Sequence, residues 1–162
     1  MLFRRSFVGV LAWLAAAPPA SAHSPTPPSG GRPGDPAKVT RIVEVVATET
    51  AFSLKALDVR DGETVRFIVR NDGIDPHELT IGTVAEHAEH RRHMKEMMEL
   101  QKKGGHAGHS MADMAQSGGV WVEPGKTGTF VWTFKRTANL EFACNIPGHY
   151  EDGMMGPIRF VK

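Results

Sequence analysis

The chain has 162 residues, with 19 basic and 18 acidic side chains and a formal net charge of +1 when histidine is neutral. A nucleic-acid-binding protein presents a strongly basic face, so this balance excludes nucleic acid as an expected partner. The single cysteine excludes an intramolecular disulfide. A length of this order suits one domain, which can bury well over half of the surface of its unfolded chain.

Residues 1–22 have the three parts of a signal peptide. A basic pair, Arg4 and Arg5, precedes an apolar run over residues 7–17, and residues 20–22 form an A-x-A cleavage site. This run is far shorter than the ~20 residues that a membrane-spanning helix needs, so we expect no membrane anchor after cleavage. The arginine pair also resembles a twin-arginine signal, which leaves both export routes open.

Cleavage after Ala22 would start the mature chain at His23 and place it in the periplasm. It would leave 17 basic and 18 acidic residues, a net charge of −1. Residues 23–37 are rich in Pro, Gly and Ser and predict a flexible lead-in to a domain over residues 38–162. Because the periplasm is oxidising, binding a metal is the remaining way to protect the lone thiol of Cys144.

Short β-type segments repeat along the domain. Several alternate apolar and polar residues, and turn signals such as Arg60-Asp61-Gly62 separate them. Seven or eight such strands predict an all-β Greek-key sandwich. The segments cover residues 39–47, 52–57, 64–71, 78–82, 119–123, 127–134, 139–144 and 156–162. The expected core aromatic residues are Phe67, Trp121, Phe130, Trp132 and Phe134.

The strand pattern is interrupted once, by an insertion over residues 84–119. Residues 84–103 contain no Gly or Pro and predict a helix. Residues 104–119 are rich in Gly and predict a loop. The insertion separates the strand that follows His77 from the strand that begins near Val120.

The closing segment EFACNIPGHYEDGMMGPIRFVK predicts a metal site. Cys144, His149 and Met154 follow one another at steps of five residues. His77, far upstream, would complete a set of two imidazoles and one thiolate with a long axial thioether, which is typical of mononuclear copper sites with one-electron chemistry. Zinc takes four closely bound ligands and does not use a thioether. The alternative for Cys144 is a buried free thiol in the core.

The closing segment resembles the copper loop of the cupredoxins, the family of azurin, plastocyanin and rusticyanin. The loop has a Cys, four residues that end in Pro-Gly, a His, four residues and a Met. The resemblance implies that His77, Cys144, His149 and Met154 are the four ligands of a type 1 copper. Met155 is the rival for the axial position. Glu78 departs from the family, since azurin-like proteins often have an Asn after the first His.

The insertion is rich in histidine and methionine and is similar to that of exported copper-tolerance cupredoxins. A methionine stripe at helical spacing is more often part of a core, but the loop repeats both residue types among few apolar neighbours. Soft thioethers with imidazoles suit Cu(I), so we expect further copper binding here. The candidates are His87, His90, His93, Met94, Met97, Met98, His106, His109, Met111 and Met114, with His23 as a separate N-terminal chelator.

Two functions remain open. The first is a periplasmic copper-tolerance protein that binds copper ions and oxidises Cu(I) through its type 1 centre. The second is a small soluble electron carrier between respiratory proteins such as c-type cytochromes, for which the insertion would be unnecessary. A multicopper oxidase needs His-x-His pairs, which this sequence lacks, so we expect no enzymatic turnover beyond Cu(I) oxidation.

Overall fold

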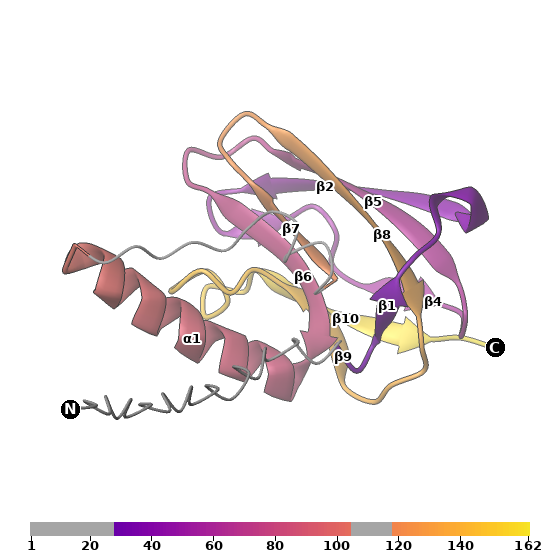
Figure 1. Ribbon diagram of the computed structural model, residues 1–162. Helices are drawn as coiled ribbons and strands as arrows, with labels where there is room; N and C mark the ends of the chain where they lie inside the picture. The colour runs from indigo at the N-terminus through magenta and orange to yellow at the C-terminus, as the bar shows by residue number, and fades with distance from the viewer. Residues whose placement is uncertain (1–27, 105–117) are drawn as a thin grey trace, which may run out of the picture.

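The computed structural model describes residues 28–104 and 118–162. Two five-stranded sheets pack face to face, and one long helix lies along the side of the second sheet (Figure 1). The predicted signal peptide, His23 and most of the predicted loop of the insertion lie outside the described residues. Within the described ranges, no helix combines the length and the apolar character needed to cross a membrane.

The first sheet has the order β1-β8-β5-β2-β3. The pair β2–β5 is parallel, and the other neighbours are antiparallel. The strands are β1 (Gly31–Pro33), β2 (Arg41–Thr48), β3 (Ala51–Phe52), β5 (Thr64–Asn71) and β8 (Thr127–Phe134).

The second sheet has the order β4-β10-β9-β6-β7 and provides the framework of the metal site. The pair β4–β10 is parallel, and the other neighbours are antiparallel. The strands are β4 (Leu57–Val59), β6 (His77–Thr83), β7 (Gly119–Val122), β9 (Leu140–Ala143) and β10 (Met155–Phe160).

These two sheets confirm the predicted β-sandwich, and the predicted strands match the observed ones within a few residues. One segment differs. Residues 52–57 were predicted as a single strand, but the chain passes there from the end of β3 in the first sheet to β4 in the second. The break follows from this change of sheet, which needs a few residues outside any ladder.

The start of the ordered domain also differs from the prediction. The flexible lead-in was expected to extend to residue 37, but β1 pairs with β8 from Gly31↔Phe134 to Pro33↔Trp132. A short 3₁₀ turn at Pro36–Lys38 follows and is capped by the side chain of Asp35. Proline is tolerated in β1 because this strand lies at the sheet edge and needs few donors.

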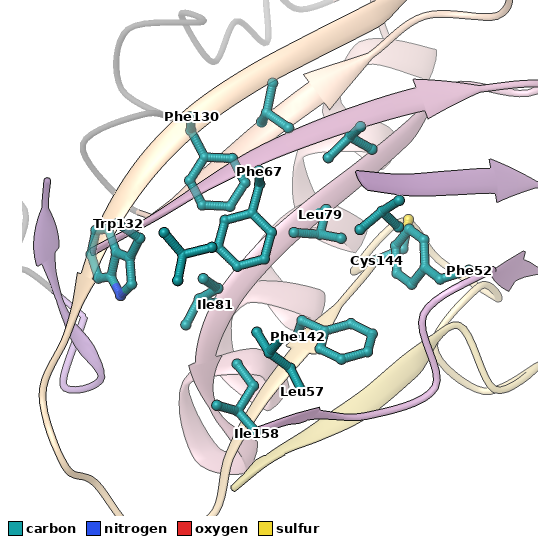
Figure 2. Close-up of a cluster of buried hydrophobic side chains, with 14 of the residues drawn as sticks. Phe52, Leu57, Phe67, Leu79, Ile81, Phe130, Trp132, Phe142, Cys144 and Ile158 are labelled. Atoms are coloured by element: carbon teal, nitrogen blue, oxygen red, sulfur yellow. The ribbon is translucent and has the colours of Figure 1, made fainter. Parts of the chain in front are cut away.

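Apolar side chains from both sheets form one core between the layers (Figure 2). Phe67 and Phe130 stack with ring centroids 4.8 Å apart, and Phe134 meets Phe67 edge-on. Trp132 is fully buried. Trp121 is an exception to the predicted core, because Val120 and Val122 take the buried positions of β7 and Trp121 is turned outward. Its Nε1 donates to Glu123.

Helix α1 (Val84–Lys102) follows β6 directly and matches the predicted helix 84–103 closely. Its start is a capping box: the Thr83 hydroxyl accepts from the Glu86 N–H, and the Glu86 carboxylate accepts from the Thr83 N–H at 2.7 Å. Ser29 also donates to Glu86, which ties the N-terminal segment to the helix. The helix contacts β6 and β9, so its orientation is set by the second sheet.

Candidate metal centre

The segment between β9 and β10, residues 144–154, forms a closed turn that we call the ligand loop (Figure 1). Its potential ligands are joined by main-chain hydrogen bonds. The N–H of Cys144 donates to the Met154 carbonyl at 3.0 Å, and the N–H of Met154 donates to the His149 carbonyl at 2.9 Å. The three residues therefore hold one another in place before any metal binds.

Two glycines give the ligand loop its shape. Gly148 has φ 97° and Gly153 has φ 95°, both in the region that disfavours residues with a Cβ. Gly148 turns the chain immediately before His149, and Gly153 turns it immediately before Met154. The glycines therefore place the imidazole and the thioether on the inner side of the turn.

Strand pairing brings the upstream histidine to this loop. The register Thr80↔Ala143 between β6 and β9 places the start of β6 beside the end of β9. His77, the first residue of β6, thereby lies beside a loop that begins 67 positions later in the chain. Potential ligand atoms of His77, Cys144 and His149 all lie within 4.8 Å of one another.

This arrangement has the dimensions of a trigonal site. Cys144 Sγ and His149 Nδ1 are 3.4 Å apart, and the rings of His77 and His149 have centroids 4.9 Å apart. Three donors bound roughly 2.0–2.3 Å from one ion lie roughly 3.5–4 Å from one another. One ion can therefore be held by all three side chains.

The buried nitrogens of His77 support a metal at this position. His77 is fully buried, and neither of its ring nitrogens has a hydrogen-bond partner within the part of the chain that the structure describes. A buried polar atom without a partner is costly, and metal ligation removes that cost. His149 is partly exposed, as expected for a residue near the apex of the loop.

The two candidates for the axial position differ in burial. Met154 is fully buried in the core cluster that also contains Cys144, whereas Met155 is 36% exposed. Residues on β10 alternate between the two faces of the sheet, which turns Met155 outward. The geometry therefore favours Met154 as the axial thioether.

The electrostatics of the pocket favour a neutral histidine and a neutral thiol in the metal-free protein. Burial lowers the pKa of His77, and the neighbouring His149 lowers it further. Burial, and after it the charge of Glu78, raises the pKa of Cys144 to about 12. A metal ion that binds here must therefore displace the thiol proton, whereas His77 is already in the form that ligates.

Glu78 lies at the centre of a buried hydrogen-bond network that sequence reasoning did not anticipate. Its main-chain N–H points to Cys144 Sγ at 3.5 Å. Its carboxylate accepts from the main-chain N–H of Asn145 at 2.9 Å and from the Asn145 Nδ2 at 2.7 Å. His90 Nε2, from α1, lies 3.2 Å from the same carboxylate. The signal available in the sequence was a charged residue directly after a predicted ligand.

The hydrogen-bond partners of Glu78 determine the direction in which its pKa is shifted. Burial acts to raise the pKa of Glu78, but the hydrogen bond and the charge of His90, together with the donors of Asn145, lower it below its ordinary value. The same ion pair raises the pKa of His90 against the opposing effect of burial. Polar groups of Asn145 and His90 thus converge on the Glu78 carboxylate, which favours its ionised form.

Helix α1 packs directly on the ligand loop. The Arg91 guanidinium lies 3.6 Å from the centre of the Tyr150 ring, and Arg91 Nε lies 3.5 Å from a Glu151 carboxylate oxygen. The Tyr150 hydroxyl donates to Glu141 on β9 at 2.7 Å. The insertion thus lies against the loop that carries His149.

The histidines and methionines of the helix that were expected to bind copper fall into two groups, buried and exposed. His87 is buried, and its two ring nitrogens lie within hydrogen-bond distance of the Asn145 side chain and the Glu141 carbonyl. Met94 is also buried, so the core alternative holds for these two residues. His93 and Met98 are exposed, and Met97 is partly exposed. His106, His109, Met111, Met114 and His23 lie outside the described residues.

A groove of about 360 Å³ runs between α1 and β6. Imidazoles and carboxylates share its lining, with His90, His93, Glu89 and Glu96 on the helix side. These are ligand types that bind divalent transition metals.

Comparison with known proteins identifies the family. The chain is 40% identical over 146 residues to the copper-resistant cuproprotein CopI of Pseudomonas aeruginosa, covering 79% of this chain and 80% of that protein. It is 41% identical over 142 residues to the CopI of Rubrivivax gelatinosus, covering 86% and 77%. No family model matches the chain.

Solved structures agree on the fold. Auracyanin B superposes with a TM-score of 0.61 at 16% identity, covering 84% of this chain and 99% of that one. The reduced auracyanin of Roseiflexus castenholzii superposes with a TM-score of 0.56 at 23% identity, covering 76% and 98%. With the close relatives and the His-Cys-His cluster, this likeness shows that the chain is a copper-binding cupredoxin and belongs to the CopI family of copper-resistant cuproproteins.

Proposed function

We propose that this chain is a periplasmic copper-tolerance protein with a redox-active type 1 centre held by His77, Cys144, His149 and Met154. The single observation that carries the proposal is the convergence of three donor atoms within 4.8 Å around the unpartnered nitrogens of His77. Bound copper supplies one-electron chemistry at such a site.

The four side chains have different parts in this proposal. Cys144 and His77 are buried and fix the position of the ion, and Met154 closes the axial side from within the core. His149 is the ligand with solvent access, so electrons enter and leave through its ring. The main-chain ties of the ligand loop keep this geometry similar in both oxidation states, which lowers the reorganisation on electron transfer.

The assignment to copper tolerance is supported by the relatives, which are named as copper-resistant, and by the insertion. Five of the eight histidines and five of the eight methionines lie within residues 84–119. We place further copper on the exposed and partly exposed residues of this set within α1, and on the four that lie outside the described residues. We leave out His87, whose ring nitrogens contact Asn145 and Glu141, and His90, whose Nε2 contacts Glu78. The proposed ligands are His93, Met97, Met98, His106, His109, Met111 and Met114, with His23 as a separate N-terminal candidate.

The position of α1 suits the additional copper as a substrate of the type 1 centre. The helix packs on the ligand loop through Arg91 and Tyr150, which supports the proposal that a Cu(I) ion bound to the helix can reach the type 1 centre. As substrate, that ion gives up one electron to the centre and becomes Cu(II). A periplasmic c-type cytochrome would then accept the electron from the reduced centre.

The second candidate function is a small electron carrier between respiratory proteins, and the partial exposure of His149 favours it. The two functions differ in the amount of copper bound. A carrier holds one copper ion per chain, and the tolerance protein holds more than one. Metal counting on the purified mature protein therefore separates them.

A tolerance assay tests the proposal in cells. A strain that lacks its own copy receives the wild-type gene, the Cys144→Ser variant, or a variant in which His93, Met97 and Met98 are alanine. We expect lower copper tolerance in both variants and a lower copper count in the second. Full tolerance in both would contradict the proposal. Glu99→Ala, an exposed change on the same helix, is the matched control.

A further inference from the structure

The strand that carries His77 contains one carboxylate. Glu78 is fully buried, as are His77 before it and Leu79 after it. Burying a carboxylate costs several kcal/mol unless hydrogen bonds replace the lost water. A buried residue of this type next to a metal ligand therefore has to be held by specific partners.

Those partners come from two different parts of the chain. Asn145, the residue after Cys144, donates twice, through its main chain and its side chain. His90, on the helix of the insertion, approaches from the other side at 3.2 Å. The Asn145 side chain is itself fixed by Thr80 at 2.8 Å and faces His87. The carboxylate is thus held between the sheet and α1.

The network reaches the thiolate ligand directly. The N–H of Glu78 points at Cys144 Sγ, and its carboxylate binds the residue next to Cys144. A fixed negative charge buried beside the thiolate ligand favours the higher positive charge on the metal. An amide of the same shape would keep the packing without that charge.

We propose that Glu78 is a positioning residue that stabilises the oxidised form of the copper centre, and that His90 gives the insertion helix control over the potential of that centre. This inference rests on the proposed type 1 site. It gives α1 a second role. The helix presents exposed side chains that we propose bind copper, and through His90 it also contacts the Glu78 carboxylate beside the copper ligands.

The first test is the midpoint potential of Glu78→Gln in the copper-loaded protein. Removing the charge makes Cu(II) less favourable relative to Cu(I), so the potential rises. Glu99→Gln removes an exposed charge from α1, away from the ligands, and leaves the potential unchanged. A potential in Glu78→Gln equal to the wild-type value overturns the role of the carboxylate.

The second test asks whether His90 acts through Glu78. His90→Leu removes the N–H, and His90→Gln keeps a donor at a similar position. We expect His90→Leu to shift the potential in the wild-type background and to have no effect in the Glu78→Gln background, because interacting residues are not additive. His90→Gln should stay nearer the wild-type value. An equal shift in both backgrounds, or no shift, overturns the link to α1.

Copper content and thiolate absorption, measured on each sample, separate this inference from the proposed function. A wild-type protein without that absorption contradicts the type 1 site itself. Normal absorption together with unchanged potentials contradicts only the part assigned to Glu78 and His90. Retained absorption in Glu78→Gln also shows that the variant has folded.

Discussion

Cys144 belongs both to the apolar core and to the ligand loop. Its side chain is fully buried in the cluster formed by the two sheets (Figure 2). Its sulfur lies 3.4 Å from His149 Nδ1. The main chain of Cys144 is tied to Met154, which is equally buried. The core therefore positions two of the four proposed ligands.

The axial assignment can be tested by comparing two neighbouring methionines. Met154→Leu preserves volume in the core but removes the thioether, so copper should remain bound while the visible spectrum and the potential change. Met155→Leu changes an outward-facing side chain and should alter neither. The measurement is visible spectroscopy with redox titration of the two copper-loaded variants. An effect confined to Met155→Leu would assign the axial ligand to Met155.

The sequence predicted some of the residues of the metal site but not the residues that surround them. The spacing of Cys144, His149 and Met154 predicted a common site because a short loop with Gly at its turns must fold back on itself. Glu78 was recognised only as a departure from the family. Its role depends on His90 and Asn145, and the second of these lies 67 positions away.

Helix α1 is held at its start by the capping box, and at Arg91 by contacts with Tyr150 and Glu151 of the ligand loop. Its bounds were predictable, because residues 84–102 lack Gly and Pro and a Thr precedes a Glu by three positions. Its buried face was not predictable. His87 and Met94 looked like metal ligands in the sequence, but both side chains are buried, and His87 contacts the Glu141 carbonyl of the second sheet.

Replacing Glu86 should weaken the helix start. Glu86→Gln removes the charge that accepts from Thr83 and Ser29, so the metal-free protein should lose about 1 kcal/mol of unfolding free energy near neutral pH. Chemical denaturation measures this loss. Glu99→Gln is the control. An unchanged unfolding free energy would show that these contacts contribute nothing.

The same contacts predict a pH dependence. Burial alone would raise the pKa of Glu86, but the hydrogen bonds of Thr83 and Ser29 lower it in the folded protein below the ordinary value of a glutamate. Stability from this group is therefore present above that value and is lost as the pH falls through the folded pKa. The difference between wild type and Glu86→Gln should shrink in denaturation curves recorded at successively lower pH. A constant difference would contradict this assignment.

The Arg91 contact should determine how firmly α1 is held on the ligand loop. Arg91→Ala removes both the stacking on Tyr150 and the ion pair with Glu151, and should cost about 1 kcal/mol. Hydrogen exchange of the α1 amides should become faster in the variant, while the core strands keep their protection. Unchanged exchange would indicate that other contacts hold the helix.

The sandwich as a whole brings together residues that are distant in the chain. Alternation and turns predicted seven or eight strands, fewer than the ten in the described residues, and the family resemblance implied the ligand set. The pairing of β6 between β9 and β7 was not readable from local pattern, because sheet order depends on contacts across the whole core. The predicted sandwich also began too late, since β1 lies within the expected lead-in.

Because ligands from two distant segments meet only in the folded chain, copper should stabilise the fold. Thermal unfolding of the copper-loaded protein should have a higher midpoint than that of the metal-free protein, since a ligand that binds only the native state shifts the equilibrium toward it. Chelation should reverse the increase. Met155→Leu should retain the increase in full. A midpoint independent of copper would contradict a site made by both segments.

The central claim is that Cys144 binds copper as a thiolate in a type 1 centre. Visible absorption of the Cu(II)-loaded protein tests it most directly, with Cys144→Ser measured beside the wild type at equal copper content. The wild type should show intense absorption from thiolate-to-copper charge transfer, and Cys144→Ser should lack it. A colourless copper-loaded wild type, or colour that survives the substitution, would contradict it.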